Sequence, residues 1–130
     1  MKVQRLVPMV TTDRMTECQA FYTTNFGCHP TFESPGYVGL RFPGGTEIGI
    51  MKPDADASCS YQGGVSFGLE VADVDAEHAR LVAAGVPIVR PLQDNPWGDR
   101  SFMVNDPAGV GVYVHRPIAL ADEYKKYLKA

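Results

Sequence analysis

The chain lacks the features that would commit it to a membrane, a nucleic acid or a redox site. None of its apolar runs approaches the roughly 18 residues of a membrane-spanning helix, and Met1–Arg5 lacks the apolar core of a secretory signal. Its formal net charge is −3, whereas nucleic-acid-binding domains present a basic face. The three cysteines, Cys18, Cys28 and Cys59, have no metal or redox spacing. We therefore expect a cytoplasmic protein with reduced thiols and with no nucleic-acid or membrane partner.

What the chain does contain is typical of one soluble folded domain. It has 130 residues, of which 45% are hydrophobic and 21% are charged. That length allows a proper core but not two independent ones. We expect a single domain over residues 1–130.

The first half predicts the order strand, helix, strand, strand, strand. An apolar run over Leu6–Thr11 precedes Thr12-Asp13, which suits a helix start. The helix continues with apolar residues at three- and four-residue spacing and ends at Gly27. Three short strands follow at 30–34, 37–42 and 46–51.

The second half repeats this order. Strands are expected at 65–71, 87–90, 100–105 and 110–115, with a helix over 76–84 capped by Asp73 or Asp75. Met51-Lys52-Pro53 at the end of the first half corresponds to His115-Arg116-Pro117 at the end of the second. An internal repeat of this kind indicates two copies of one structural unit. We therefore expect module one over 1–53, a linker over 54–64, module two over 65–117 and a C-terminal helix over 118–130. The residues alone define the fold class as α+β.

The only tryptophan lies in the most informative stretch, Pro96-Trp97-Gly98, followed by a strand and then by Asp106-Pro107-Ala108-Gly109. Matching segments occur in the same order earlier in the chain: Val7-Pro8, Ala20-Phe21-Tyr22, Tyr37–Leu40 and Thr46–Ile50. With them the chain resembles the glyoxalase/bleomycin-resistance/extradiol-dioxygenase (vicinal oxygen chelate) superfamily. Within it, the chain is most similar to bleomycin-resistance-type drug-binding proteins.

This resemblance implies two βαβββ modules that form a curved mixed sheet with a cleft. It also implies a homodimer, because Pro8 matches the proline at which resistance-type relatives exchange their N-terminal strands. A proline removes a ladder donor and can hinge a strand.

The resemblance also locates four positions where metal-dependent members carry their ligands. In this chain they are Leu6, Ser66, Gly49 and Tyr113. A divalent metal needs imidazole, carboxylate or thiolate ligands, which these residues do not supply. We expect neither a metal nor another cofactor.

Aromatic residues are the candidates for holding a ligand. Trp97, Tyr37 and Phe32 match aromatic positions of the drug-binding groove in the resemblance, and two rings can sandwich a flat heteroaromatic group. Gly49 leaves space in its strand, which often marks the close approach of a ligand, although a bulge or tight strand crossing explains it equally well.

Polar candidates lie on the strands of the second half. Ser66, Gly68 and Glu70 alternate along one face of a strand, and Tyr113 and His115 share a face of the last strand. Arg100 and Glu70 are the charged groups that would orient a ligand. Resistance-type relatives carry additional tryptophans where this chain has Gly68 and Glu70, so the ligand is expected to differ from bleomycin.

Three functions compete at this point. The first is non-catalytic binding or sequestration of an aromatic or cationic antibiotic-like molecule, conferring resistance. The alternative is a metal-independent isomerase or lyase that uses Tyr113, Glu70 or His115 for proton transfer. A third is a sensing or structural dimer that uses residues 118–130 as its partner surface.

Overall fold

The structure, a computed structural model, describes residues 1–54 and 60–129, which divide into two compact units. The first unit comprises Met1–Gly63 together with Asp106–Gly109, and the second comprises Gly64–Asn105 together with Val110–Ala130. Part of the expected linker over 54–64, and with it Cys59, lies outside the described residues.

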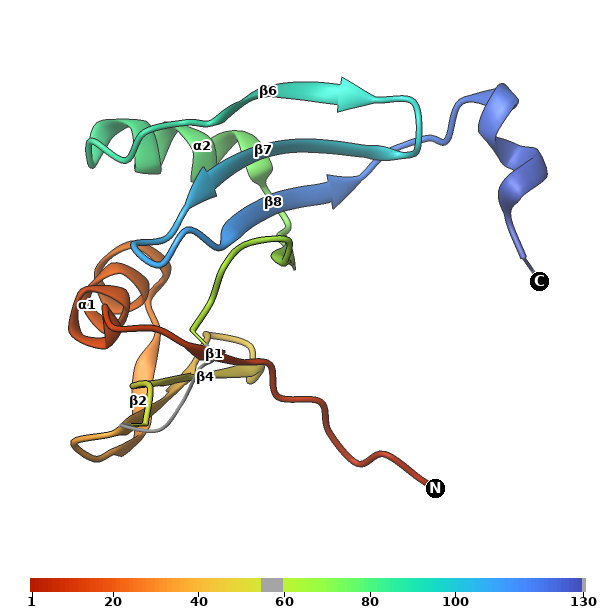
Figure 1. Ribbon diagram of the computed structural model, residues 1–130. Helices are drawn as coiled ribbons and strands as arrows, with labels where there is room; N and C mark the ends of the chain where they lie inside the picture. The colour runs from red at the N-terminus through yellow and green to blue at the C-terminus, as the bar shows by residue number, and fades with distance from the viewer. Residues whose placement is uncertain (55–59, 130) are drawn as a thin grey trace. The chain divides into compact units, whose positions relative to one another are not determined.

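The first unit has one helix on a four-stranded mixed sheet (Figure 1). In the sheet, the strands follow the order β1-β4-β3-β2, with β1 parallel to β4 and the other pairs antiparallel. The elements are β1 (Met9–Thr11), α1 (Met15–Phe26), β2 (His29–Glu33), β3 (Tyr37–Arg41) and β4 (Glu47–Met51).

Helix α1 begins at Met15, after the expected caps Thr12 and Asp13, and ends at Gly27 as the sequence predicts. The N-cap residue is Arg14, whose side chain makes no capping hydrogen bond, and the Thr12 hydroxyl accepts the Arg14 backbone N–H at 3.1 Å in the turn before the helix. Gly27 ends the helix in the left-handed region at φ 67°. The buried face of α1 packs on the alternate, inward-facing residues of β3 and β4. The core of this unit includes Val10, Met15, Cys18, Tyr22, Val38, Leu40, Ile48 and Ile50.

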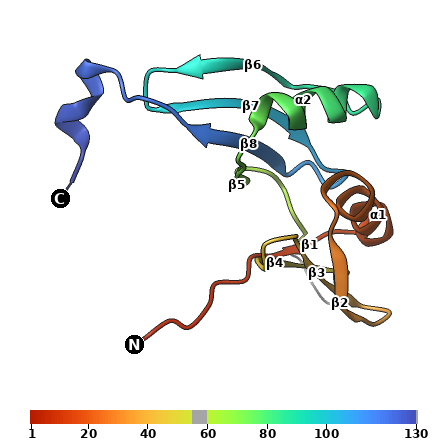
Figure 2. The same ribbon diagram turned by 180° about the vertical axis from the view of Figure 1, so that it is seen from behind.

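The second unit repeats the arrangement, with its helix along one face of the sheet (Figure 2). Its strand order is β5-β8-β7-β6, and β5 is parallel to β8. Asp73 caps the helix by accepting the Ala76 N–H at 3.0 Å. The elements are β5 (Ser66–Glu70), α2 (Val74–Ala83), β6 (Arg90–Asn95), β7 (Asp99–Asn105) and β8 (Gly111–Pro117).

These observations confirm the α+β class and the two βαβββ modules. The strand registers of the two sheets correspond. Gly39 pairs with Gly49 between β3 and β4, and Met103 pairs with Tyr113, each 64 positions later in the sequence, between β7 and β8. The curved sheet with a cleft and the strand exchange stay predictions.

Two segments differ from the sequence expectation. The strand expected at 87–90 lies instead at Arg90–Asn95, because the turn after Asn95 pairs that residue with Asp99 and sets the register of the hairpin. The range 118–130, expected to be a helix, contains a six-residue 3-10 helix, η1 (Asp122–Tyr127).

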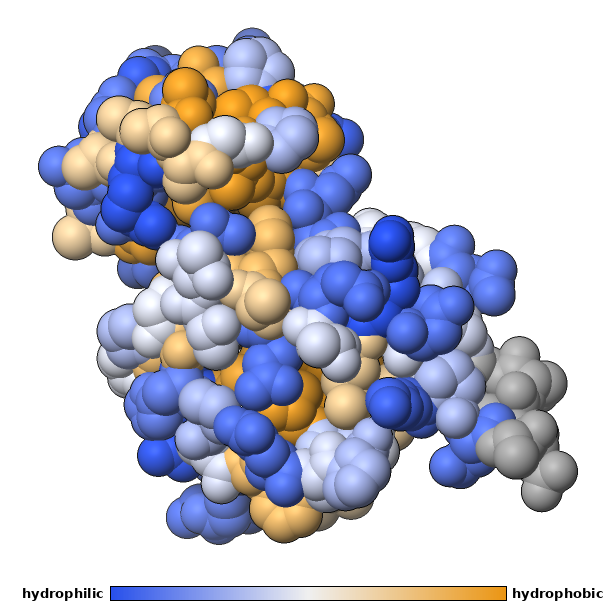
Figure 3. Space-filling view, turned by 90° about the vertical axis from the view of Figure 1, so that its left-hand side faces the viewer, coloured by the Kyte–Doolittle hydropathy of each residue, from blue (hydrophilic) through white to orange (hydrophobic). Residues whose placement is uncertain are grey.

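Large apolar side chains remain on the surface of both units. Figure 3 shows one face on which hydrophobic residues gather in patches among hydrophilic ones. Exposed examples include Leu6, Met9, Phe32, Val82, Val89 and Trp97. Because such exposure is normal in folded proteins, it does not by itself indicate a ligand site. A pocket with converging polar groups is needed. No helix of the described chain is long and apolar enough to cross a membrane.

Candidate functional site

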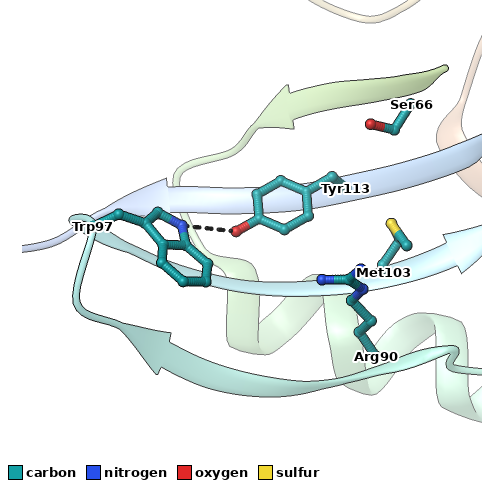
Figure 4. Close-up of a pocket in the computed structure, with 5 residues that line it drawn as sticks. All are labelled: Ser66, Arg90, Trp97, Met103 and Tyr113. Carbon is teal, nitrogen blue, oxygen red and sulfur yellow. Dashed lines mark hydrogen bonds between the residues drawn. The ribbon is translucent and has the colours of Figure 1, made fainter. Parts of the chain in front are cut away.

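A pocket of about 410 Å³ lies on the face of the second sheet that is turned away from α2 (Figure 4). Alternation along the strands determines which side chains reach it. On β8, Val112 and Val114 are buried toward the helix, which leaves Tyr113 on the open face. The pocket is lined by Ser66, Arg90, Trp97, Met103 and Tyr113.

Trp97 stands on the tight turn that joins β6 to β7. The Gly98 N–H donates to the Asn95 carbonyl at 3.1 Å, and Gly98 has φ 102°, a conformation suited to glycine. The segment after β8 fixes this turn, because the Ile118 N–H donates to the Gly98 carbonyl at 2.9 Å. The Ala121 N–H donates to the Pro96 carbonyl at 3.1 Å. The turn therefore holds the indole at the pocket with half of its surface exposed (50%).

The polar edges of Trp97 and Tyr113 are tied to one carboxylate. The Tyr113 hydroxyl lies 2.9 Å from both carboxylate oxygens of Asp99 and donates to them. The Trp97 Nε1–H donates to Asp99 Oδ2 at 3.2 Å and to the Tyr113 hydroxyl at 3.3 Å. Both rings are thus anchored through their polar atoms, and their faces are left for apolar contact.

A buried polar pair supports Asp99 in turn. Asn95 and Ser101 are each only 4% exposed. The Asn95 side-chain amide donates to Asp99 Oδ1 and to the Ser101 hydroxyl, both at 2.8 Å, and its oxygen accepts from Gln93 at 3.2 Å. A fully paired network of this kind fixes side chains before a ligand arrives, which lowers the entropy lost on binding.

Three predicted site residues, Trp97, Ser66 and Tyr113, meet in this pocket. His115 lies beside them on the same face, its ring centroid 5.5 Å from that of Tyr113. Gly68 and Glu70 follow Ser66 along the edge strand β5 and are exposed. A Cβ atom at Gly68 would approach His115 Nε2 to 3.5 Å, which is an ordinary contact.

Arg100 does not lie with the other predicted residues. It alternates on β7 with the buried Phe102 and therefore occupies the helix-facing side of the sheet. There it forms ion pairs with Asp75 at 2.8 Å and with Asp94 at 3.0 Å. The hydrogen bonds from Arg100 lower the pKa of Asp75, and those two carboxylates raise the pKa of Arg100. Arg100 therefore lies on the opposite face of the second sheet from Tyr113, and its role in orienting a ligand stays a prediction.

Phe32, Tyr37 and Gly49 belong to the first unit and lie together on its sheet. The ring centroids of Phe32 and Tyr37 are 6.0 Å apart. The Tyr37 ring lies over Gly49, where a side-chain carbon would collide with it. A register shift between Pro30 and Phe32 pairs Phe32 with Gly39 and so turns its ring to the face of Tyr37.

The sequence analysis missed three residues of the pocket region. Asp99 lies two positions after the predicted Trp97, and Met103 lies on the same face of its strand as Asp99 by alternation. Both residues could therefore have been predicted from the sequence. Arg90 could not have been predicted, because the face to which its side chain points depends on an irregularity in the pairing of β6 with β7.

The metal-ligand positions of the superfamily contain no ligand set here. In the described residues, no group of three or more His, Cys, Asp or Glu side chains is arranged to hold a metal ion. Leu6 is exposed, Gly49 has no side chain, and the Tyr113 hydroxyl is engaged with Asp99. This donor chemistry does not fit the divalent metal of the metal-dependent members.

Comparison with known proteins agrees with the fold. The model of the Glyoxalase/Bleomycin resistance protein/Dioxygenase superfamily matches residues 4–114. The chain belongs to this superfamily.

Similar proteins include uncharacterised mycobacterial proteins and several solved structures. The chain is 31% identical over 119 residues to an uncharacterised protein of Mycobacterium bovis, covering 80% of this chain and 77% of that protein. It is 26% identical to TioX from Micromonospora sp. ML1, with a TM-score of 0.72 and coverage of 89% of this chain and all of that one (100%). A lactoylglutathione lyase from Agrobacterium tumefaciens, 22% identical with a TM-score of 0.72 over 89% and 96% of the two chains, shares the fold.

Proposed function

We propose that this protein binds and sequesters a small, partly aromatic, antibiotic-like molecule without a metal ion, as a relative of the bleomycin-resistance type. The observation that carries the proposal is the anchored pair of rings. Trp97 and Tyr113 are fixed by Asp99 at a pocket of about 410 Å³, and the indole stays half exposed. Pockets of this size suit small organic ligands.

The energetics of such a site favour binding over chemistry. Each ring stacked on a ligand contributes on the order of 1 kcal/mol beyond the area it buries. Because the network around Asp99 already holds the rings, little side-chain entropy is lost when a ligand enters. The functional groups of Trp97 and Tyr113 that could react are already engaged in hydrogen bonds.

A homodimer forms part of this proposal. β1 is an edge strand of three residues, and Met9 on it is exposed, as is Leu6 just before it. An exposed apolar edge is suited to pairing with another chain. Light scattering coupled to gel filtration tests this point, and a monomer at micromolar concentration would contradict it.

One observation favours the alternative, a metal-independent isomerase or lyase. The Tyr113 hydroxyl donates to the Asp99 carboxylate at 2.9 Å, and the His115 ring is adjacent to that of Tyr113, so these groups would be the candidates for proton transfer. The two functions rank the variants differently. Binding predicts that Trp97→Ala removes affinity while Tyr113→Phe is mild, and catalysis predicts the reverse order in turnover.

Titration of the intrinsic fluorescence of Trp97 with planar and glycopeptide antibiotics tests the proposal. We expect saturable quenching at micromolar concentration or below for at least one of them. Calorimetry then compares Trp97→Ala with Tyr127→Ala, a control that removes an exposed ring from η1. Absence of binding by both methods, or equal loss in both variants, would contradict a ligand site at Trp97.

A further inference from the structure

Arg90 is the positively charged residue of the pocket lining. Its side chain extends from β6 toward the pocket that it lines with Met103 and Tyr113 (Figure 4). Among the described residues, its guanidinium group forms no ion pair and no hydrogen bond. The neighbouring arginine of the same hairpin, Arg100, is by contrast paired with two carboxylates.

A β-bulge turns Arg90 to this face. Gln93 pairs with Ser101, and Arg90 pairs with Met103, so three steps on β6 match two steps on β7. In a regular strand, residues three apart point to opposite faces. The extra residue, within Pro91-Leu92, reverses the alternation and brings Arg90 to the side of Met103. Bulges commonly re-aim a side chain beside a functional site.

The carboxylates on this face do not neutralise Arg90. Asp99 already accepts hydrogen bonds from Tyr113, Trp97 and Asn95, and it is not part of the pocket lining. Glu70 lies on β5, at the opposite edge of the sheet from β6. Three strand spacings, or about 14 Å, separate these edges. Within the described part of the chain, the pocket therefore combines the two rings of Trp97 and Tyr113 with one guanidinium group that has no acidic partner.

From this arrangement we infer that the ligand is a planar aromatic anion, in which the ring stacks on Trp97 or Tyr113 and a carboxylate or similar acid group binds Arg90. A guanidinium matches a carboxylate with two parallel hydrogen bonds, which adds specificity as well as affinity. The inference rests on the proposed function and refines it: it keeps the aromatic ligand that the sequence predicts and replaces the cationic alternative with an anion.

Three probes of equal shape and different charge test the inference by calorimetry: naphthalene-2-carboxylate, its neutral amide and 2-naphthylmethylammonium. We expect the carboxylate to bind best. Arg90→Gln should weaken the carboxylate roughly tenfold or more and leave the amide within about twofold, as expected for loss of a charge-assisted hydrogen bond. Arg90→Lys should retain an intermediate affinity.

Arg116→Gln is the matched control. It removes the same charge from β8 on the helix-facing side, where Arg116 lies opposite Arg100, and it should leave all three affinities unchanged. Preference for the ammonium, or a carboxylate affinity unaffected by Arg90→Gln, would overturn the anionic ligand while leaving aromatic binding intact. Failure of all three probes, together with the absence of binding by the antibiotics, would instead refute the proposed function itself.

Discussion

The hydroxyl of Tyr113 lies 2.9 Å from both carboxylate oxygens of Asp99, which also accepts the indole N–H of Trp97. Tyr113 is on β8 and Asp99 begins β7, so the carboxylate connects two strands to the turn that presents the indole. This connection explains how an exposed aromatic side chain keeps a defined orientation. It also makes the mobility of the indole, though not its presence at the pocket, depend on the Tyr113 hydroxyl.

Tyr113→Phe should loosen Trp97 without unfolding the protein. The variant removes one donor to Asp99 and one acceptor from the indole, and we expect a loss of about 1 kcal/mol in the free energy of unfolding. Urea denaturation measures this loss, and fluorescence anisotropy of Trp97 should fall as the indole becomes mobile. Tyr127→Phe, on an exposed ring, provides the control. Unchanged anisotropy in Tyr113→Phe would contradict the anchoring role.

Tyr22→Phe should destabilise the first unit more strongly. The Tyr22 hydroxyl donates to Asp106 Oδ2 at 2.7 Å, and Tyr22 is fully buried while Asp106 is 4% exposed. Removing the donor leaves a buried carboxylate oxygen without this partner, which costs about 1–3 kcal/mol. Chemical denaturation monitored by circular dichroism tests the value. A loss as small as that of Tyr127→Phe would show that the bond contributes little.

Alkaline pH should destabilise the fold at pH values below those at which the buried thiols of Cys18 and Cys28 ionise in the folded protein. Burial raises the pKa of the Cys18 thiol to about 12, and burial raises that of Cys28 to about 11, from 9.0. Between pH 9 and about 11 the unfolded chain releases these protons and the folded chain retains them. The free energy of unfolding should therefore fall by at most about 1.4 kcal/mol per pH unit for each thiol.

Urea denaturation at pH 8 to 11 measures how the free energy of unfolding changes with pH. Cys18→Ala should make that change smaller by the contribution of one thiol. Burial also raises the pKa of Tyr22, which adds to the slope in the same direction. Stability that stays constant from pH 8 to 11 would contradict the assignment of buried neutral thiols.

The strand glycines should differ in their tolerance of alanine. A methyl group at Gly49 would collide with the ring of Tyr37, whereas one at Gly68 would meet His115 only at 3.5 Å. We expect Gly49→Ala to cost about 1–3 kcal/mol through overpacking and Gly68→Ala to be nearly neutral. Thermal unfolding of the two variants gives the comparison. Equal melting temperatures would show that Tyr37 moves aside freely.

Much of the architecture could be predicted from local sequence signals. The end of α1 at Gly27, the start of α2 after Asp73 and the repeat between the two halves follow from glycine conformation, capping and periodicity. The sequence also allows the face of Arg100 to be predicted. Arg100 lies two residues before the apolar Phe102 and therefore on the same face of the strand, toward the core.

The pocket depended instead on pairing between strands. The position of Asp99 relative to Tyr113 requires the register of β7 and β8, which the turn geometry determines. Arg90 reaches the pocket only because a bulge shifts β6, and no period in the sequence indicates an extra residue. Short-range patterns thus predicted which elements form but not which side chains converge.

The single indole permits the most direct test of the central claim, that the pocket around Trp97 binds an aromatic ligand. In a ¹⁵N-labelled sample, Trp97 gives the only indole N–H resonance, since the chain has one tryptophan. Addition of naphthalene-2-carboxylate should shift this resonance in a saturable manner, together with the Met103 methyl group and the amide of Tyr113. Saturable shifts confined to other residues, with the indole resonance unmoved, would place the ligand elsewhere and contradict the account.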